Sequence, residues 1–207
     1  MYKYFFKRFL DIVLSGVGMI ILLPVYIILA LYVAIFLGRP VLFGQERIGK
    51  DEKPFKLYKF RSMTNTKDKD GNLLPESARL TKAGILLRNS SLDELPELWA
   101  IFIGQMSIVG PRPMPTYYAP YFLPKERKRH SVRGGLIPPD SLSGKAVTTY
   151  EEQFKYECDY ADNISLWLDI KVIFYTFKIL FKRVEEDYGT CERPHLNVYR
   201  KEMKIEK

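Results

Sequence analysis

Residues 12–37 read IVLSGVGMIILLPVYIILALYVAIFL and contain no charged side chain. An apolar stretch of about 20 residues is long enough to cross the hydrocarbon core of a bilayer as a helix. Basic residues lie on both sides of this stretch: Lys3, Lys7 and Arg8 before it, and Arg39, Arg47 and Lys50 after it. The run is longer than the apolar part of a signal peptide, and no small-residue cleavage site follows it. The sequence therefore predicts a retained membrane anchor.

Pro24 lies near the middle of this apolar stretch. A proline removes a helical hydrogen bond and bends the helix axis. Because positive charge flanks both ends of the stretch, the positive-inside rule gives no preferred orientation for a spanning helix. Two arrangements stay open: a bent spanning helix, or a re-entrant segment that breaks at Pro24 and brings both basic flanks to one face. The re-entrant form requires neighbouring groups to satisfy the broken backbone.

The overall composition indicates a folded, basic protein. Hydrophobic residues make up 47% of the chain and charged residues 27%, a balance typical of globular domains. The net charge of +8 favours an anionic partner. Since no nucleic-acid-binding module or dense basic block is present, membrane lipids and phosphorylated substrates fit better than nucleic acid. Cys158 and Cys191 have no CxxC spacing and are predicted to be free thiols, and His130 and His195 to be ordinary surface or polar-core residues.

The remaining chain predicts an α+β fold that is mostly helical. Aromatic and β-branched runs on either side of a turn at 49–52 predict a short β-hairpin within 40–63. A polar loop is expected at 64–78 and a Gly/Pro loop at 134–145. Helices are expected over 80–88, 93–102, 117–133 and 166–183.

Two of these helices carry residues with more than one interpretation. The basic end of 117–133 is either a solvated face or a contact for lipid headgroups or polyprenol phosphate. In the last helix, Asp169 lies on the side opposite to the lysines, which is costly unless it is paired, so it forms an ion pair, caps the helix or lines a polar site. Phe174, Phe177 and Phe181 are expected in the core, with an interfacial helix as the alternative.

Residues 88–99, RNSSLDELPELW, carry the most chemistry. Pro96 is tolerated only in a first helical turn, which places Asp93 and Glu94 at a helix start. Ser91 and Glu94 match a capping box, an interpretation that needs no catalysis. The alternative interpretation is a phosphate site, because helix starts attract anions and two arginines accompany this one. These are Arg88 and Arg112, the second of which lies between two prolines.

A carboxylate held in charged form by such surroundings can attack phosphorus. A divalent ion would screen the negative diphosphate from that nucleophile. Mg²⁺ suits carboxylate and phosphate oxygens, and one or two carboxylates together with substrate phosphates suffice for it. The stretch therefore favours Asp93 as a nucleophile with Mg²⁺ as the cofactor.

Five motifs along nearly the whole chain together resemble one family, the monotopic phosphoglycosyl transferases, which are bacterial sugar transferases. They are residues 7–11 (KRFLD), 59–63 (KFRSM), 88–96, 106–113 (MSIVGPRP) and 168–171 (LDIK). The resemblance implies a re-entrant membrane helix in residues 1–39, broken at Pro24. It also implies a phosphoglycosyl transferase domain with interfacial helices in residues 40–207, on the cytoplasmic face of the bacterial inner membrane.

The resemblance further implies the reaction. A sugar 1-phosphate would pass from a UDP-sugar to Asp93, releasing UMP, and then to polyprenol (undecaprenyl) phosphate, as the first membrane step of glycoconjugate synthesis. Glu94 would assist, and Mg²⁺ would bridge Asp93 and the diphosphate. The phosphate-holding residue would be Arg112, and the other residues lining the site would be Lys59, Arg88 and Asp169.

Two positions depart from the family pattern. Leu23 precedes the breaking proline where family members carry Ser, and Lys145 follows Gly144 where many have Arg. The resemblance thereby makes Lys145 a candidate substrate-binding residue, since lysine keeps the charge at that position but lacks the two-pronged donor geometry of arginine. The loop at 134–145 is therefore atypical, and the sugar, the glycan pathway and homo-oligomerisation stay open.

Two other classes of function compete with the enzyme. One is a non-catalytic, membrane-docked module that binds other proteins through its C-terminal helix, in which Asp93 serves only as a cap. The other is a soluble nucleic-acid binder.

Overall fold

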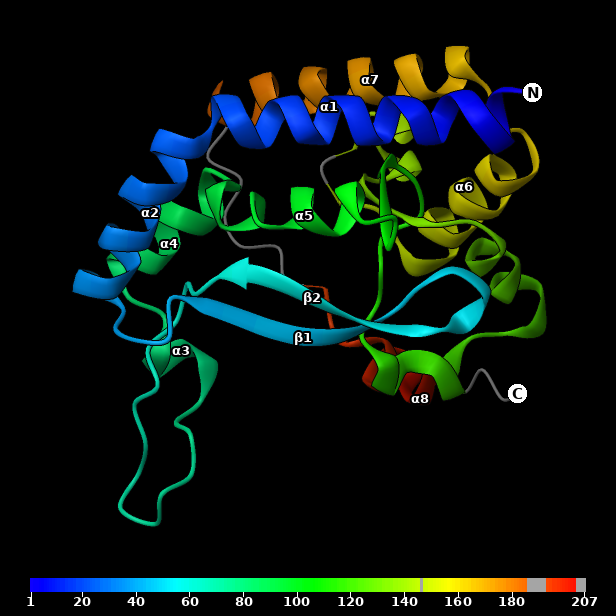
Figure 1. Cartoon of the computed structure of the whole chain (residues 1–207). Helices are drawn as coiled ribbons and strands as arrows, with labels where there is room; N and C mark the ends of the chain where they lie inside the picture. Colours follow the sequence, from blue (N-terminus) through cyan, green and yellow to red (C-terminus); the bar gives the residue numbers. More distant parts are fainter. Residues whose placement is uncertain (146, 186–192, 204–207) are drawn as a thin grey trace.

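The computed structural model describes residues 1–145, 147–185 and 193–203, without the side chains of residues 181–185. Within these residues the fold is mostly helical with two small sheets, as the α+β prediction expects (Figure 1). Cys191 lies outside the described residues, so the pair of free thiols stays a prediction, as does the core position of the Phe181 side chain.

The apolar N-terminal stretch forms two helices. A π-helical turn at Tyr2–Phe6 leads into α1 (Lys7–Ile21), and α2 (Leu23–Phe36) follows with Pro24 in its first turn. The helix axis bends by 64° at this break (Figure 1). In the described residues no single helix has the length and apolar character to cross a bilayer, but this bent pair meets both criteria jointly.

Charged residues near the start of α1 attach it to the rest of the fold. Arg8 donates to the carbonyls of Ile101 and Phe102, both at 2.6 Å, at the end of α5 (Glu97–Phe102). Asp11 accepts the backbone N–H of Ile108 at 2.9 Å in β3 (Met106–Val109). The KRFLD motif thus fixes α1 across α5 and β3.

The predicted β-hairpin is confirmed. Strand β1 (Leu42–Ile48) pairs antiparallel with β2 (Pro54–Phe60), with Phe43 opposite Lys59. The turn between them has Asp51 and Glu52 in left-handed conformations, at φ 55° and 58°. Because side chains alternate along a strand, Phe43, Gln45 and Lys59 share one face of the hairpin.

A second, parallel sheet was not predicted. Strand β3 pairs with β4 (Gly134–Ile137), in a region where the sequence predicted only a loop. A side chain at Gly135 would lie 2.0 Å from the backbone nitrogen of Gly110, so only glycine permits this close approach. A 3₁₀ segment follows at Pro139–Ser143.

The predicted helix over 117–133 is wrong. This region forms two 3₁₀ segments, Thr116–Tyr121 and Pro124–Ser131, since Pro120 and Pro124 interrupt the α-helical hydrogen bonds. Several of its basic residues are paired within the protein, whereas Lys125 and Lys128 are exposed, so contact with lipid headgroups or polyprenol phosphate stays a prediction. Arg129 and Glu157 form a fully buried ion pair, and Lys128 pairs with Asp162.

The other helices agree more closely with expectation. A short α3 (Glu76–Arg79) precedes α4 (Lys82–Asn89), which Thr81 caps and which was predicted at 80–88. The last predicted helix is α7 (Leu166–Glu185). Two helices were not predicted, α6 (Tyr150–Asp162) and α8 (Leu196–Glu202). His130 is a polar-core residue, as predicted, and burial lowers its pKa to about 4.

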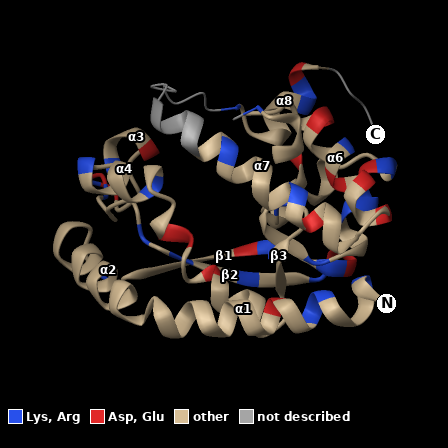
Figure 2. Ribbon diagram, turned by 90° about the horizontal axis from the view of Figure 1, so that it is seen from above, with Lys and Arg blue, Asp and Glu red and all other residues tan. Residues whose placement is uncertain are grey.

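The aromatic residues of α7 do not lie in the core. Phe174 and Phe177 are exposed, as are Trp167 and Ile170, so the core prediction is wrong and the interfacial alternative fits. Helices α7 and α1 both lie along the top of Figure 1, and the outward side chains of α1 are also apolar. Figure 2 shows α2 and the second half of α1 without charge, while charged residues gather around α6 and α8. The fold thus separates an apolar helical region from a charged one.

Candidate active site

A cavity of 530 Å³ lies between the hairpin, α4 and the turn that carries Asp93. Four of the predicted site residues line it together: Lys59, Arg88, Asp93 and Glu94. It also contains charged residues that were not predicted: Arg47, Arg61, Glu76 and Arg79. Most of its charged lining is therefore cationic, which suits an anionic ligand.

The turn that presents Asp93 differs from the predicted helix start. Ser91 adopts a left-handed conformation, with φ 55°, and its side chain caps nothing, so the capping-box interpretation is wrong. Residues Leu92–Glu94 form a 3₁₀ turn, and α5 begins only after Pro96. Positive side chains, rather than a long helix, therefore supply the attraction for anions here.

Asp93 is buried, with 9% of its surface exposed. Burial raises its pKa above the ordinary aspartate value, and the positive charges of Lys59 and Arg88 oppose this rise. None of the hydrogen bonds between described residues reaches its carboxylate from another side chain. The cations thus favour the charged form, but burial has the larger effect on the pKa.

Glu94, the next residue, is held by cations. It accepts a hydrogen bond from Lys59 Nζ at 2.5 Å, and Arg112 Nη2 lies 3.4 Å from the same carboxylate oxygen. Burial alone would raise its pKa, but Arg112 and Lys59 outweigh burial and lower the pKa below the ordinary glutamate value. Glu94 therefore stays ionised and orients both cations beside Asp93.

A third carboxylate, Glu97, was missed by the sequence analysis. It is buried, and its oxygen lies 3.1 Å from Lys59 Nζ, so one ammonium group is shared by Glu94 and Glu97. Burial raises the pKa of Glu97. Its spacing of three residues from Glu94 was the available signal, because that spacing brings side chains to one side of a helical turn.

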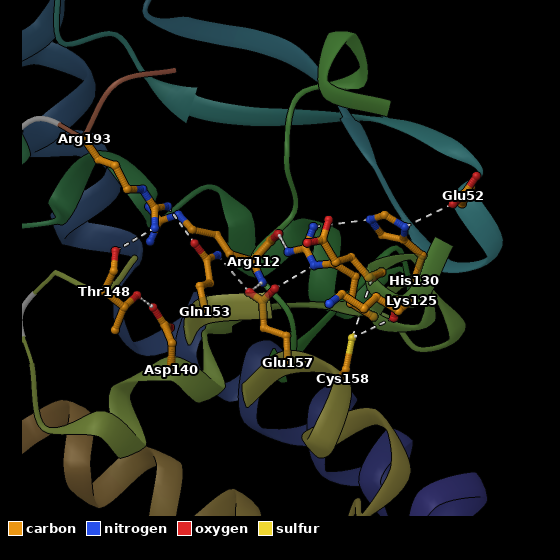
Figure 3. A network of polar contacts seen from close by, with 12 residues as sticks. Glu52, Arg112, Lys125, His130, Asp140, Thr148, Gln153, Glu157, Cys158 and Arg193 are labelled. Atoms are coloured by element: carbon orange, nitrogen blue, oxygen red, sulfur yellow. Dashed lines mark hydrogen bonds and ion pairs between the residues drawn. The ribbon is translucent and has the colours of Figure 1, made fainter. Parts of the chain in front are cut away.

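Arg112 lies next to the cavity rather than in its lining. It borders a small adjoining pocket together with Lys59, Glu94 and Glu97. Its backbone N–H donates to Glu157 at 2.8 Å, and Arg129 donates to its carbonyl at 2.6 Å (Figure 3). The two prolines and these two hydrogen bonds fix the backbone, while the side chain stays half-exposed and reaches Glu94.

Two residues expected in the site lie elsewhere. Asp169 is buried at the start of α7, where it accepts hydrogen bonds from Tyr2 at 2.6 Å, Lys7 at 2.7 Å and Tyr160 at 2.6 Å. The structure therefore agrees with the ion-pair interpretation of Asp169. Lys145 pairs with Glu152 at 2.6 Å on the surface and does not line the cavity.

The carboxylates of the cavity fit a divalent cation only together with a ligand. Among the described residues no group of three or more His, Cys, Asp or Glu side chains is arranged to hold a metal. Mg²⁺ commonly binds one or two carboxylates and completes its shell with phosphate oxygens and water. Asp93 is suited to this because Lys59 and Arg112 already occupy Glu94.

An apolar cavity of 610 Å³ adjoins the charged one. Phe60 lines both, and Pro96, two residues after Glu94, lines the apolar cavity. The rest of its wall comes from the bend between the N-terminal helices, from the hairpin and from α5: Met19, Leu23, Tyr26, Ile27, Ala30, Val41, Leu42, Tyr58 and Trp99. The charged cavity thus borders an apolar space to which the uncharged stretch 12–37 contributes five of the eleven lining residues.

Fold and site together define a protein with a cationic, carboxylate-bearing cavity beside a bent apolar helix pair. The chain belongs to the bacterial sugar transferase family, which it matches over residues 2–183, and it is therefore a transferase. It is 43% identical to the sugar transferase EpsL of Bacillus subtilis over 142 residues, 69% of this chain and 70% of that one.

Two longer relatives carry more specific names. The UDP-glucose:undecaprenyl-phosphate glucose-1-phosphate transferase of Klebsiella pneumoniae is 36% identical over 83% of this chain. The UDP-N-acetylgalactosamine-undecaprenyl-phosphate N-acetylgalactosaminephosphotransferase of Aeromonas hydrophila is 32% identical over 85% of it. The alignments cover only 39% and 44% of these two relatives.

Proposed function

We propose that this protein transfers a sugar 1-phosphate from a UDP-sugar to polyprenol phosphate through a covalent intermediate on Asp93. The observation that carries the proposal is one buried carboxylate, free of other side-chain hydrogen bonds, in a cavity whose other charged residues are mostly cations. The names of the Klebsiella and Aeromonas relatives support the substrate class.

In the first step, an Asp93 carboxylate oxygen attacks the phosphorus that carries the sugar. The bond between this phosphorus and the oxygen bridging to the uridine phosphate breaks, and UMP leaves with the electron pair. Lys59 and Arg88, whose positive charges act on Asp93, bind the diphosphate, as does Arg112 from the adjoining pocket. A bound Mg²⁺, held by Asp93 and the phosphates, would neutralise the charge that develops on the leaving UMP.

In the second step, a phosphate oxygen of the polyprenol phosphate attacks the same phosphorus. The acyl-phosphate bond breaks and returns the electron pair to the Asp93 carboxylate, so the product is a polyprenol diphosphate sugar. Attack needs the charged form of Asp93. Burial raises the pKa of this carboxyl, whereas the positive charges of Lys59 and Arg88 lower it and so favour the attacking form.

The apolar cavity supports the choice of acceptor. A long isoprenoid chain needs an apolar surface to bind, and its phosphate must reach the cavity that contains Asp93. The two cavities are neighbours, because Phe60 lines both. The bend at the α1–α2 junction supports a re-entrant membrane segment. The proposal also has the catalytic domain on the cytoplasmic face, where UDP-sugars are available. The apolar outward residues of α7 would then lie at the membrane surface.

The test is the release of nucleotide from a panel of UDP-sugars by the detergent-solubilised full chain with Mg²⁺ and undecaprenyl phosphate. The proposal expects UMP with at least one sugar and a lipid-linked diphosphate sugar as the second product. Release of UDP instead would identify a transferase of the sugar alone and contradict the proposal. Absence of turnover with every donor would favour a non-catalytic membrane module.

A further inference from the structure

The segment of residues 193–203 lies beyond the family match, which ends at residue 183, yet it packs back onto the domain. Leu196 is fully buried in the core, in contact with a cluster that includes Met114 and Phe154. The hydroxyl of Tyr150 donates to the carbonyl of Pro194 at 3.0 Å. This segment is therefore an integral part of the fold that the family match does not include.

Arg193 is one of the residues through which this segment makes polar contacts with the domain interior. Its guanidinium lies 3.7 Å from the ring centre of Tyr150. One nitrogen donates to the carbonyl of Thr148 at 2.8 Å, and another donates to Oε1 of Gln153 at 2.6 Å (Figure 3). Arginine carries donors only, so it fixes which end of the Gln153 amide faces it.

The orientation of the Gln153 amide determines whether its nitrogen or its oxygen faces Glu157. With its oxygen toward Arg193, the amide directs Nε2 to Glu157 Oε1, at 3.0 Å. A reversed amide would place oxygen against a carboxylate oxygen, which is repulsive. Gln153 and Glu157 are both buried, so water cannot easily replace the lost hydrogen bond.

Glu157 in turn fixes the backbone of Arg112. The oxygen that accepts from Gln153 also accepts the Arg112 N–H at 2.8 Å. The other oxygen pairs with Arg129 at 2.6 Å, and Arg129 donates to the Arg112 carbonyl. Neither side chain of this ion pair has exposed surface. Gln153 and Glu157 thus connect Arg193 of the C-terminal segment to Arg112, which reaches Glu94 (Figure 3).

We infer that Arg193 is a positioning residue for binding of the donor diphosphate, because it sets the direction of the hydrogen bonds that hold Arg112. This inference rests on the proposed function, in which Arg112 binds phosphate. It assigns a role in the site to the C-terminal segment, although Arg193 itself does not touch the cavity. The ligand class concerned is a nucleoside diphosphate, whichever sugar it carries.

The experiment is calorimetric titration of UDP with Mg²⁺ into the solubilised full chain, comparing the wild type with Arg193→Ala, Arg193→Lys and Arg200→Ala. Arg193→Ala is expected to weaken UDP binding about tenfold, the equivalent of about 1.4 kcal/mol. Arg193→Lys should recover part of this loss, because lysine can still donate to Gln153. Arg200→Ala is the matched control. Arg200 docks the same segment through Glu126 at 2.6 Å and Glu151 at 3.2 Å, and it pairs with neither Gln153 nor Glu157.

The control is expected to lose thermal stability and to keep its affinity for UDP. Unchanged affinity of Arg193→Ala, or equal weakening in Arg200→Ala, would overturn the inference. If Arg193→Ala does not fold, Gln153→Met provides the test instead, because it removes the hydrogen bonds that Gln153 makes with Arg193 and Glu157. If both fold, the double variant should bind no more weakly than Arg193→Ala. Failure of the proposed function would look different, because the wild type itself would then release no UMP from any UDP-sugar.

Discussion

Asp93 and Glu94 are consecutive in the chain, and the protein shifts their pKa values in opposite directions. Burial raises the pKa of Asp93, whereas Arg112 and Lys59 outweigh burial and lower the pKa of Glu94. Paired carboxylates with divergent pKa values are typical of sites that assign them different roles. Here the two roles are a nucleophile, Asp93, and a residue that holds the neighbouring cations, Glu94.

Substitutions at these two residues should change stability with opposite signs. A raised pKa means that the ionised form of Asp93 costs stability as pH rises through the folded-state pKa, so Asp93→Asn should raise the Tm at pH 7. A lowered pKa means that Glu94 contributes stability above its unfolded-state pKa, which is lost as pH falls, so Glu94→Gln should lower the Tm. Thermal unfolding of both variants in detergent provides the measurement.

The Asp93→Asn variant should lose activity although its stability rises. Asp93→Asn should reduce turnover by about 10³-fold or more, as loss of a nucleophile does in other enzymes. A merely structural role for Asp93 would instead leave substantial turnover in a folded variant. Measuring UMP release and Tm on the same preparation separates these cases.

The rate should depend on pH through Asp93. Because the charged carboxylate attacks and its pKa is raised in the free protein, kcat/KM should fall on the acid side with an apparent pKa above the ordinary aspartate value of about 3.9. The profile of kcat/KM against pH, with stability checked at each pH, tests this. An acid limb at or below the ordinary value would contradict the raised pKa.

The pair of Lys7 and Asp169 should be structural. Removing one partner from a buried pair is costly, so Lys7→Met should lower the free energy of unfolding by about 3 kcal/mol. The double variant with Asp169→Asn should recover part of this loss, because no unpaired charge then stays buried. The amide oxygen can accept from one of Tyr2 and Tyr160, and the amide NH2 can donate to the phenol oxygen of the other. Denaturant unfolding measures both.

Turnover per folded molecule should be unchanged in Asp169→Asn. A large loss of turnover at undiminished stability would restore the role in the site that the family resemblance implied for Asp169.

Cysteine labelling should place both ends of the apolar helix pair on one side of the membrane. Tyr4→Cys and Arg39→Cys, in a chain lacking Cys158 and Cys191, should both react with an impermeant maleimide in inverted vesicles and in neither case in spheroplasts. Asp70→Cys, in the exposed polar loop, reports the side of the catalytic domain. Reaction of residues 4 and 39 from opposite sides would indicate a spanning helix.

Local features of the fold could be predicted from the sequence. The hairpin at 42–60, the helix α7 and the break at Pro24 follow from alternation, helical periodicity and proline chemistry. The parallel pairing of β3 with β4 could not, because it depends on close approach of Gly110 and Gly135, which are distant in sequence.

The residues of the candidate site, too, could be predicted only in part from the sequence. Lys59, Arg88, Asp93 and Glu94 were predicted and do line one cavity. Glu97 was missed because its spacing of three residues from Glu94, the one available signal, does not show that the side chain will be buried beside Lys59. Asp169 and Lys145 were assigned by resemblance, and only the structure shows their partners, Lys7 and Glu152.

The most direct test of the account is the intact mass of the protein after incubation without acceptor lipid. The incubation contains Mg²⁺ and a UDP-sugar that the enzyme uses as a donor when the acceptor is present. The account predicts a mass increase of one phospho-sugar, located on Asp93 by peptide analysis, absent in Asp93→Asn and lost when polyprenol phosphate is added. A wild type that turns over with acceptor but never carries this adduct, and releases no UMP in the absence of acceptor, would contradict the covalent intermediate.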